Sequence, residues 1–544
     1  MGGADAASRR QGAEQLRAAI RALRQDPRSL RILLACTIAA VVTVFEPPYL
    51  TLSTSVIQGG LRVPNSPTPM ILAAAFLVLA LITLLAGTSA DLFGRRRFLI
   101  LGLVGLTLSN LLAMASLGTS QLFAVADLIN TVSGVIVLPA SIAIVTLAFD
   151  QFVRPFAYGV LFGIQGTALV VGSLLIPLLG EVWDGRATFV PVLILGVVAL
   201  VLVPRHVRES KAPASLRRGS VMLNLILTAG LFAVLFLVVT AGIRSSESLL
   251  ALTLTLTLVL IVAVIRWLGR RSRRFTQIKI YGGRDLGLAI FAGLMLMFAE
   301  GCFFYQTGPF FYDVQQVGDI EFALRYVPFV VGLLLGGVLV ARLALRFGAR
   351  RILALSFVLT GASLLGLSLL QVDTPFWMMI VPITAFGLAM GLGSPTRTTI
   401  VMGAPPEGLV NSAAAVNTAA GQGGYALGVI VSSVLVTKNA DALFIAALDA
   451  AGVPPETVAV IASGLEDTVS RLTTNAYPSL PAEVEALARA SYANAFTSGM
   501  TQVFAMVAMV MFVMAALMLV GMRRGLRATL AAPSGSFLPG DEAP

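Results

Sequence analysis

Residues 87–97 read Gly-Thr-Ser-Ala-Asp-Leu-Phe-Gly-Arg-Arg-Arg and stand between two long apolar stretches. A related run, Leu-Arg-Phe-Gly-Ala-Arg-Arg-Ile-Leu, occupies residues 345–353, and residues 134–139 recur loosely at residues 391–395. Both echoes are offset by about 255 residues, and membrane folds often arise from duplicated halves of this kind. The sequence therefore predicts two related halves.

The composition is that of an integral membrane protein. The chain has 544 residues, of which 57% are hydrophobic and 12% charged, whereas a soluble domain carries about 25% charged residues. A spanning helix needs about 20 apolar residues, and fourteen apolar stretches of roughly this size are present. We predict an all-α fold with 14 transmembrane helices, at 31–57, 70–90, 98–117, 121–148, 156–179, 187–204, 221–243, 248–267, 286–312, 325–345, 351–371, 376–402, 409–436 and 497–521.

The repeat divides these spans into two six-helix halves, because its offset pairs the second span with the tenth and the fourth with the twelfth. The seventh and eighth spans are then a two-helix insert. The predicted organisation is a basic N-terminal segment (1–30), an N-terminal half (31–204), a linker with the insert (205–285), a C-terminal half (286–521) with an external loop (438–494), and a tail (522–544).

The net charge of +11 reflects basic clusters that all fall on the side of the predicted membrane that holds both termini. Cytoplasmic loops carry such an excess of Lys and Arg, so we expect both termini to be cytoplasmic. No groove-sized recognition motif for nucleic acid is present. The two cysteines, Cys36 and Cys302, lie within predicted spans and are expected to be buried.

Four charged residues interrupt the spans: Glu46, Asp127, Glu300 and Arg397. A charge in the hydrocarbon costs about 2.5 to 3.5 kcal/mol, so such residues persist mainly where they face a bundle interior or a watery cavity. Glu46 precedes two prolines that unsettle the helix beside it. It can serve as a proton site, or it can have a structural role, either permanently neutral or bound to a neighbouring residue. Asp127 suits a second proton site, an attraction for a cationic substrate, or a polar cavity rim.

Glu300 stands near Tyr305, Gln306 and several phenylalanines, a combination that suits an amphipathic or cationic ligand. The alternative places those phenylalanines in the core or against lipid. For Arg397 we favour slightly that the side chain snorkels to the inner interface; otherwise it points inward to an acid or an anionic head group. Gln165 and Asn417 can add polar groups to the same path, or can bond one helix to the next.

Residues 87–97, together with residues 326–351 and 387–428, resemble the major facilitator superfamily and its fourteen-helix drug:proton antiporters. The resemblance implies a major facilitator fold. It also implies a latch that keeps the cytoplasmic side closed, with gating roles for Gly87, Asp91, Gly94, Arg95 and Arg96. The chain departs from that branch at Asp127, where the family usually has arginine. It also departs at Ile176-Pro177-Leu178-Leu179-Gly180-Glu181, where antiporters have a Gly-Pro pair followed by two glycines.

These features predict a secondary active transporter of the plasma membrane, a monomer that exports hydrophobic or amphipathic small molecules in exchange for protons. Export of a lipid, glycolipid or siderophore is the nearest alternative, and a non-transporting receptor or scaffold is another. An enzyme is not expected, because no metal, nucleophile or phosphate-loop pattern is present, and we expect no cofactor.

Overall fold

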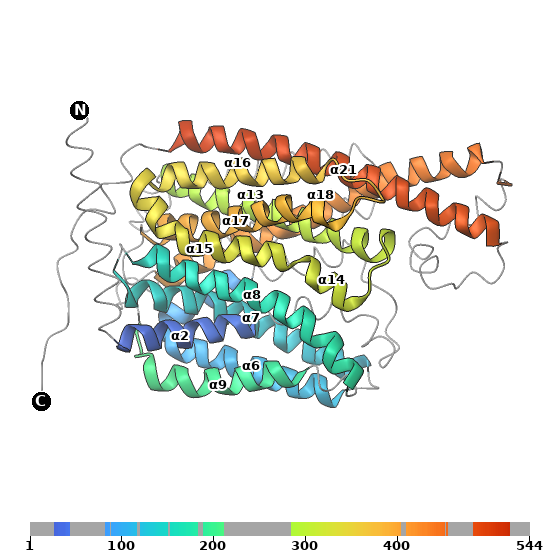
Figure 1. Cartoon of the computed structure of the whole chain (residues 1–544). Coiled ribbons are helices and arrows are strands. Elements are labelled where there is room, and N and C mark those ends of the chain that lie inside the picture. The colour runs from blue at the N-terminus through green and yellow to red at the C-terminus, as the bar shows by residue number, and fades with distance from the viewer. Residues whose placement is uncertain are drawn as a thin grey trace, which may run out of the picture.

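The computed structural model describes residues 27–43, 82–87, 89–116, 120–150, 153–182, 189–211, 284–403, 410–451, 453–454 and 482–522, and all structural statements concern these residues. Within them the regular structure is entirely helical. The helices lie roughly side by side in one bundle, and two of them project well beyond it (Figure 1).

The first group of helices precedes the linker: α2 (Pro27–Val42), the short helix Ile82–Phe93, α6 (Arg95–Ala115), α7 (Ser120–Ala148), α8 (Arg154–Val182) and α9 (Val190–His206). The second group follows it: α13 (Arg284–Pro309), the π-helix η3 (Phe310–Val314), α14 (Asp319–Arg325), α15 (Val327–Phe347), α16 (Ala349–Leu367), α17 (Phe376–Met402), α18 (Val410–Ala450) and α21 (Ala482–Gly521). Each group packs mainly on itself, as the two halves in Figure 1 show.

The repeated loop has the same backbone shape in both copies. Gly94 and Gly348 have φ angles of 121° and 84°, and each stands directly before the next helix. A side chain disfavours such a φ, so glycine lets the chain reverse sharply between two antiparallel helices. The latch residues are confined to the first copy, since Leu345 and Ala349 occupy the positions that correspond to Asp91 and Arg95.

The described residues contain nine helices that are long and apolar enough to cross a membrane, and two shorter apolar helices. Large apolar side chains cover the outer faces of α6, α9, α15 and α17, as expected for helices in contact with lipid. The predicted insert at 221–243 and 248–267 lies outside the described residues, as does most of the predicted span 70–90, so the count of fourteen remains a prediction.

Two predicted spans lie within helices that extend well past them. The spans at 409–436 and 497–521 are parts of α18 and α21, which have 41 and 40 residues and are each about 60 Å long. Beyond the bundle they continue as a pair, because Phe444 and Leu448 of α18 pack on Ala488 and Tyr492 of α21. Apolarity alone does not reveal such a paired extension, which runs into the predicted external loop (Figure 1).

The two halves meet along α8 and α15 and along α7 and α18. At the first contact, Gly159 of α8 lies against the backbone of Gly337 in α15, where a Cβ on either residue has no room. Small residues allow helix backbones to approach this closely in membranes. The halves are therefore in direct backbone contact at this point.

Candidate functional site

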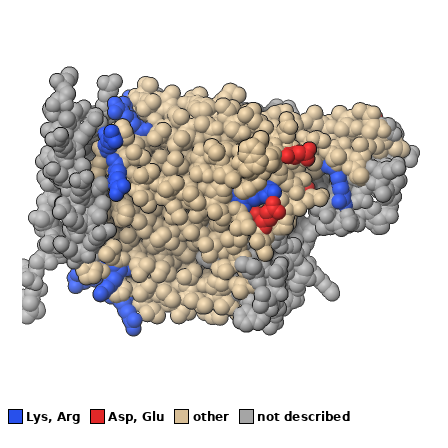
Figure 2. Space-filling view, viewed as in Figure 1, with Lys and Arg blue, Asp and Glu red and all other residues tan. Residues whose placement is uncertain are grey.

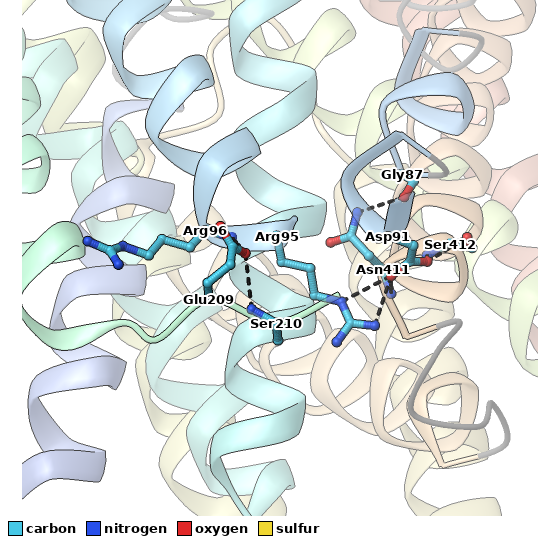
Figure 3. Close-up of polar contacts among 8 residues, drawn as sticks. All are labelled: Gly87, Asp91, Arg95, Arg96, Glu209, Ser210, Asn411 and Ser412. Carbon is cyan, nitrogen blue, oxygen red and sulfur yellow. Dashed lines mark hydrogen bonds and ion pairs between the residues drawn. The ribbon is translucent and has the colours of Figure 1, made fainter. Parts of the chain in front are cut away.

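The helix Ile82–Phe93 is joined to α18 of the other half by the carboxylate of Asp91. Asp91 accepts hydrogen bonds from Ser412 N (2.8 Å), Ser412 Oγ (2.7 Å) and Asn411 N (3.3 Å) in the first turn of α18. The side chain of Asn411 in turn donates to Gly87 O at 3.0 Å. A carboxylate is stabilised at a helix N-terminus by the free N–H groups and the helix dipole. We call Asp91, Arg95, Asn411 and Ser412 the inner latch (Figure 3).

Arg95 connects the inner latch to a second set of contacts, since its backbone N–H donates to Ser210 O at 3.1 Å, next to Glu209. Its guanidinium donates to Asp91 Oδ1 through Nε (3.0 Å) and Nη2 (2.8 Å), and both side chains are buried. Glu209, after α9, accepts from the backbone N–H groups of Arg96 and Arg97 at 3.1 and 3.2 Å. Gly94 favours this cap, because its φ of 121° disfavours a side chain and a Cβ there would stand 2.7 Å from the Glu209 carboxylate and displace it.

A second polar group lies inside the C-terminal half. Arg397 of α17 is 5% exposed, and its Nη1 donates to Asn417 Oδ1 at 2.9 Å and Asn417 O at 3.3 Å. Asn417 of α18 also donates to Thr398 Oγ1 at 3.2 Å. Gly293 of α13 lies directly against Nη1 and leaves no room for a side chain there. The guanidinium is therefore fixed between three helices.

Glu300 of α13 faces this guanidinium. Its carboxylate interacts electrostatically with Arg397 and with Tyr425 of α18. Its Oε2 is enclosed by the protein and has no hydrogen-bond partner among the described residues, and the same is true of Arg397 Nε. We call Glu300, Arg397, Asn417 and Tyr425 the Glu300–Arg397 site. The carboxylate and the guanidinium thus face each other without a hydrogen bond to Oε2 or Nε from any residue that the structure describes.

The snorkelling interpretation of Arg397 is wrong. A snorkelling side chain reaches water at the interface, whereas this guanidinium is enclosed and donates to Asn417. Hydropathy locates a residue along a helix but not around it, so the sequence left the direction of the side chain open.

The other predicted site residues are divided between the halves. Gln165 of α8 donates to Ala40 O (3.3 Å) and Thr43 Oγ1 (3.4 Å) and so bonds two helices of the N-terminal half. Among the aromatic residues near Glu300, Phe303 is fully buried and stacks on Phe386 at 4.4 Å between ring centroids, in the core. Glu46 and the side chain of Asp127 lie outside the described residues.

Sequence reasoning did not find several of the contacting residues, among them Thr83, Glu209, Asn411, Ser412 and Gln422. Thr83 Oγ1 donates to Gln422 Oε1 at 2.8 Å and joins the two halves. Glu209 had a signal, since it is the one acid within the basic run 205–218. Asn411 and Ser412 are residue types that favour helix N-termini. Thr83 and Gln422 carried no signal, because hydroxyls and amides are common in spans.

Comparison with known proteins decides the family, since residues 29–429 match the Major Facilitator Superfamily. The chain belongs to this family. As a member of the Major Facilitator Superfamily it is a multi-pass membrane protein and a secondary transporter, and it is not an enzyme.

Several curated relatives within the superfamily are resistance and efflux proteins. The Methylenomycin A resistance protein of Bacillus subtilis is 25% identical over 375 residues, which cover 67% of this chain and 78% of that protein. The Tetracenomycin C resistance and export protein of Streptomyces glaucescens is 24% identical, with coverages of 76% and 77%. The Multidrug efflux pump LfrA of Mycolicibacterium smegmatis is 22% identical, with coverages of 85% and 90%.

Solved structures share the superfamily fold. The proton:xylose symporter XylE bound to 6-bromo-6-deoxy-D-glucose has a TM-score of 0.57 and 13% identity, with 93% of this chain and 98% of that chain covered. A bacterial homolog of the human lysosomal transporter Spinster, inward-facing and unoccupied, has a TM-score of 0.53 and 15% identity, with coverages of 92% and 99%. At these identities the likeness concerns the fold alone.

Proposed function

We propose that this chain exports hydrophobic or amphipathic small molecules in exchange for protons, by alternating access of the two halves. Relatives that are resistance, export or efflux proteins support small molecules as the substrate class and export as the direction of transport. The fourteen-helix drug:proton antiporter branch is the part of the superfamily that fits this proposal. Glu300 carries the proton-coupling part of it.

Glu300 suits exchange because its carboxylate is enclosed, yet Oε2 has no hydrogen-bond partner in the part of the chain that the structure describes. A buried charge without a partner is costly. Arg397 lowers that cost electrostatically, but its Nη1 is bound to Asn417 rather than to Glu300. The carboxyl group is therefore free to bind either a proton or a donor group of a substrate. When two ligands compete for one group, binding of the first releases the second, which is the requirement for exchange.

The second requirement is a pathway that opens to one side at a time. The inner latch joins the halves at the end of the bundle where α2 begins and α21 ends. Figure 2 shows most of the visible Lys and Arg at this end, whereas the visible acidic residues, with some basic residues beside them, lie toward the other. By the positive-inside rule this end is cytoplasmic, so the proposed orientation places both termini in the cytoplasm and the α18–α21 extension outside. The inner latch then closes the cytoplasmic side, and Glu46 and Asp127 remain further candidates for proton or substrate binding.

The test is transport of ethidium, an amphipathic dye, in proteoliposomes with an imposed pH gradient. We expect Glu300→Gln to abolish gradient-driven ethidium movement while the protein elutes as the native protein does in size-exclusion chromatography. Asp449→Asn is the matched control, because Asp449 is exposed on the α18 extension, away from the site. Glu46→Gln and Asp127→Asn test the other two acids. Gradient-driven rates that equal the native rate in all three acid variants would refute proton coupling through these residues.

A further inference from the structure

We infer that Thr83 and Gln422 form a second clasp between the halves, and that α18 connects this clasp and the inner latch to the Glu300–Arg397 site. The inference rests on the proposed alternating-access cycle. It adds positioning roles for Thr83 and Gln422.

α18 contacts Arg397 and the N-terminal half within a few turns. Asn417 binds the Arg397 guanidinium, and a Cβ on Gly421 would stand 3.4 Å from Arg397 Nη2. The next residue, Gln422, accepts the hydrogen bond from Thr83 of the other half. One helical turn therefore has one side against the site and one side against the opposite half.

The same helix also moves with Glu300, because α13 and α18 are in backbone contact. Gly424 and Gly428 of α18 lie against the carbonyl oxygens of Leu294 and Phe298, and Gly301 of α13 lies against that of Tyr425. None of the three positions has room for a Cβ, and packed backbones of this kind transmit displacement rather than absorb it. A change at Glu300 thus reaches Gln422 through rigid elements.

The surface opposite α18 is one face of the helix Ile82–Phe93. Thr83, Gly87 and Asp91 follow at intervals of four residues, which places them on one side of a helix. All three contact α18, with Thr83 at the level of Gln422 and Asp91 at the first turn. Leu84 packs with Val416 and Ala419 between the two polar contacts. We call this contact between the helix Ile82–Phe93 and α18 the seam. It is continuous, with the inner latch at the end where α18 begins and the Thr83–Gln422 clasp at the opposite end.

Opening of this side requires both contacts to separate. A hydrogen bond weakens steeply when its geometry is disturbed, so a small displacement of α18 at Arg397 breaks the clasp first. A displacement at the Glu300–Arg397 site therefore reaches the inner latch through the clasp. Loss of the clasp should favour the opened seam, although every group of the site is still present.

The experiment measures alkylation by N-ethylmaleimide of a cysteine placed in the seam by Val416→Cys, with Cys36 and Cys302 replaced by alanine. We expect Thr83→Val and Gln422→Leu each to raise the labelling rate about three- to tenfold, as the loss of one hydrogen bond allows. The double variant should be no faster than the faster single variant, because both remove the same bond. Thr83→Ser retains the hydroxyl and should label near the parent rate.

Asn130→Leu is the matched control, because Asn130 of α7 is a buried amide that accepts a hydrogen bond from Ser109 of α6 within the same half at 3.1 Å, away from α13 and the seam. It should leave the labelling rate unchanged. The link to the site is tested by adding Glu300→Gln, which should change labelling in the parent and less so in the Thr83→Val background. Unchanged labelling in Thr83→Val and Gln422→Leu contradicts the proposal that these residues hold the seam closed. An equal effect of Glu300→Gln in the parent and in the Thr83→Val background contradicts the proposed connection between the clasp and the Glu300–Arg397 site. Labelling needs neither substrate nor a pH gradient. A failure of the proposed proton-coupled transport, which the ethidium assay measures, can therefore be distinguished from a failure of the clasp.

Discussion

Asp91 and Ser412, 321 residues apart in the sequence, are joined by two hydrogen bonds to one carboxylate oxygen, at 2.8 Å from the backbone N–H and 2.7 Å from the hydroxyl. Arg95 binds the other oxygen of the same buried carboxylate. The carboxylate of Asp91 thus accepts hydrogen bonds both from the first turn of α18, in the C-terminal half, and from the buried guanidinium of Arg95, in its own half. This contact between the helix Ile82–Phe93 and the first turn of α18 therefore depends on the charge of that carboxylate.

Asp91→Asn should loosen the start of α18, because it removes the charge that Arg95 and two amide groups share. Hydrogen bonds to charged groups contribute about 1.5 to 3 kcal/mol, so exchange of the Asn411 and Ser412 amides should accelerate tenfold or more in hydrogen-exchange mass spectrometry. Asp150→Asn is the control, since Asp150 is exposed in another loop. Unaltered exchange at Asn411 and Ser412 in Asp91→Asn would show that the inner latch does not order α18.

Gly94→Ala should lower stability. It places a side chain at φ 121°, against the Glu209 carboxylate at 2.7 Å, and strained backbone of this kind costs about 1 to 3 kcal/mol. Thermal unfolding in detergent measures the effect as a lower midpoint. Gly318→Ala is the control, because Gly318 has φ −70° and nothing within 4 Å of an added Cβ. Equal midpoints for the two variants would contradict the preference for glycine at position 94.

Gly293→Ala should impair transport without preventing folding, because its methyl group occupies the place of Arg397 Nη1. The guanidinium must then leave Asn417 or change its distance from Glu300. We expect at least a tenfold loss in the gradient-driven rate, comparable to the effect of a misplaced catalytic or binding group. Gly287→Ala on the same helix has nothing within 4 Å of its Cβ and should transport normally. A normal rate in Gly293→Ala would mean that the position of Arg397 does not matter for transport.

Gly159→Ala should separate the two halves at α8 and α15, since its Cβ meets the backbone of Gly337. Backbone cannot yield as a side chain can, so we expect a lower unfolding midpoint and a slower transport cycle. Gly163→Ala, one turn away, meets only the end of Leu334 at 3.3 Å and should have a smaller effect on both. The order of the two midpoints checks the prediction, and a reversed order contradicts it.

The sequence predicted the helical membrane fold and its duplication because both leave local signals. Long apolar runs mark spans, and Phe-Gly with basic residues marks the reversal at Gly94 and at Gly348, both of which have positive φ. The extensions of α18 and α21 were missed, because their stability comes from packing of Phe444 on Tyr492 rather than from apolarity along one segment.

The candidate site was predictable residue by residue but not as a group. Rare charges in apolar segments singled out Glu300 and Arg397, since their cost in lipid is high. Their mutual placement depends on how α13, α17 and α18 rotate against one another, and glycines such as Gly293 set that rotation. Periodicity contains no information on such contacts, so the pairing of Arg397 with Asn417 emerged only from the fold.

The most direct test of proton exchange at Glu300 is proton release on substrate binding. Purified protein in weakly buffered detergent solution is mixed with a substrate already shown to be transported, and the pH change is recorded. The native protein should release protons, and Glu300→Gln should release about one fewer per protein molecule, because linkage requires that competing ligands displace each other. Equal release by the native protein and Glu300→Gln would contradict the account.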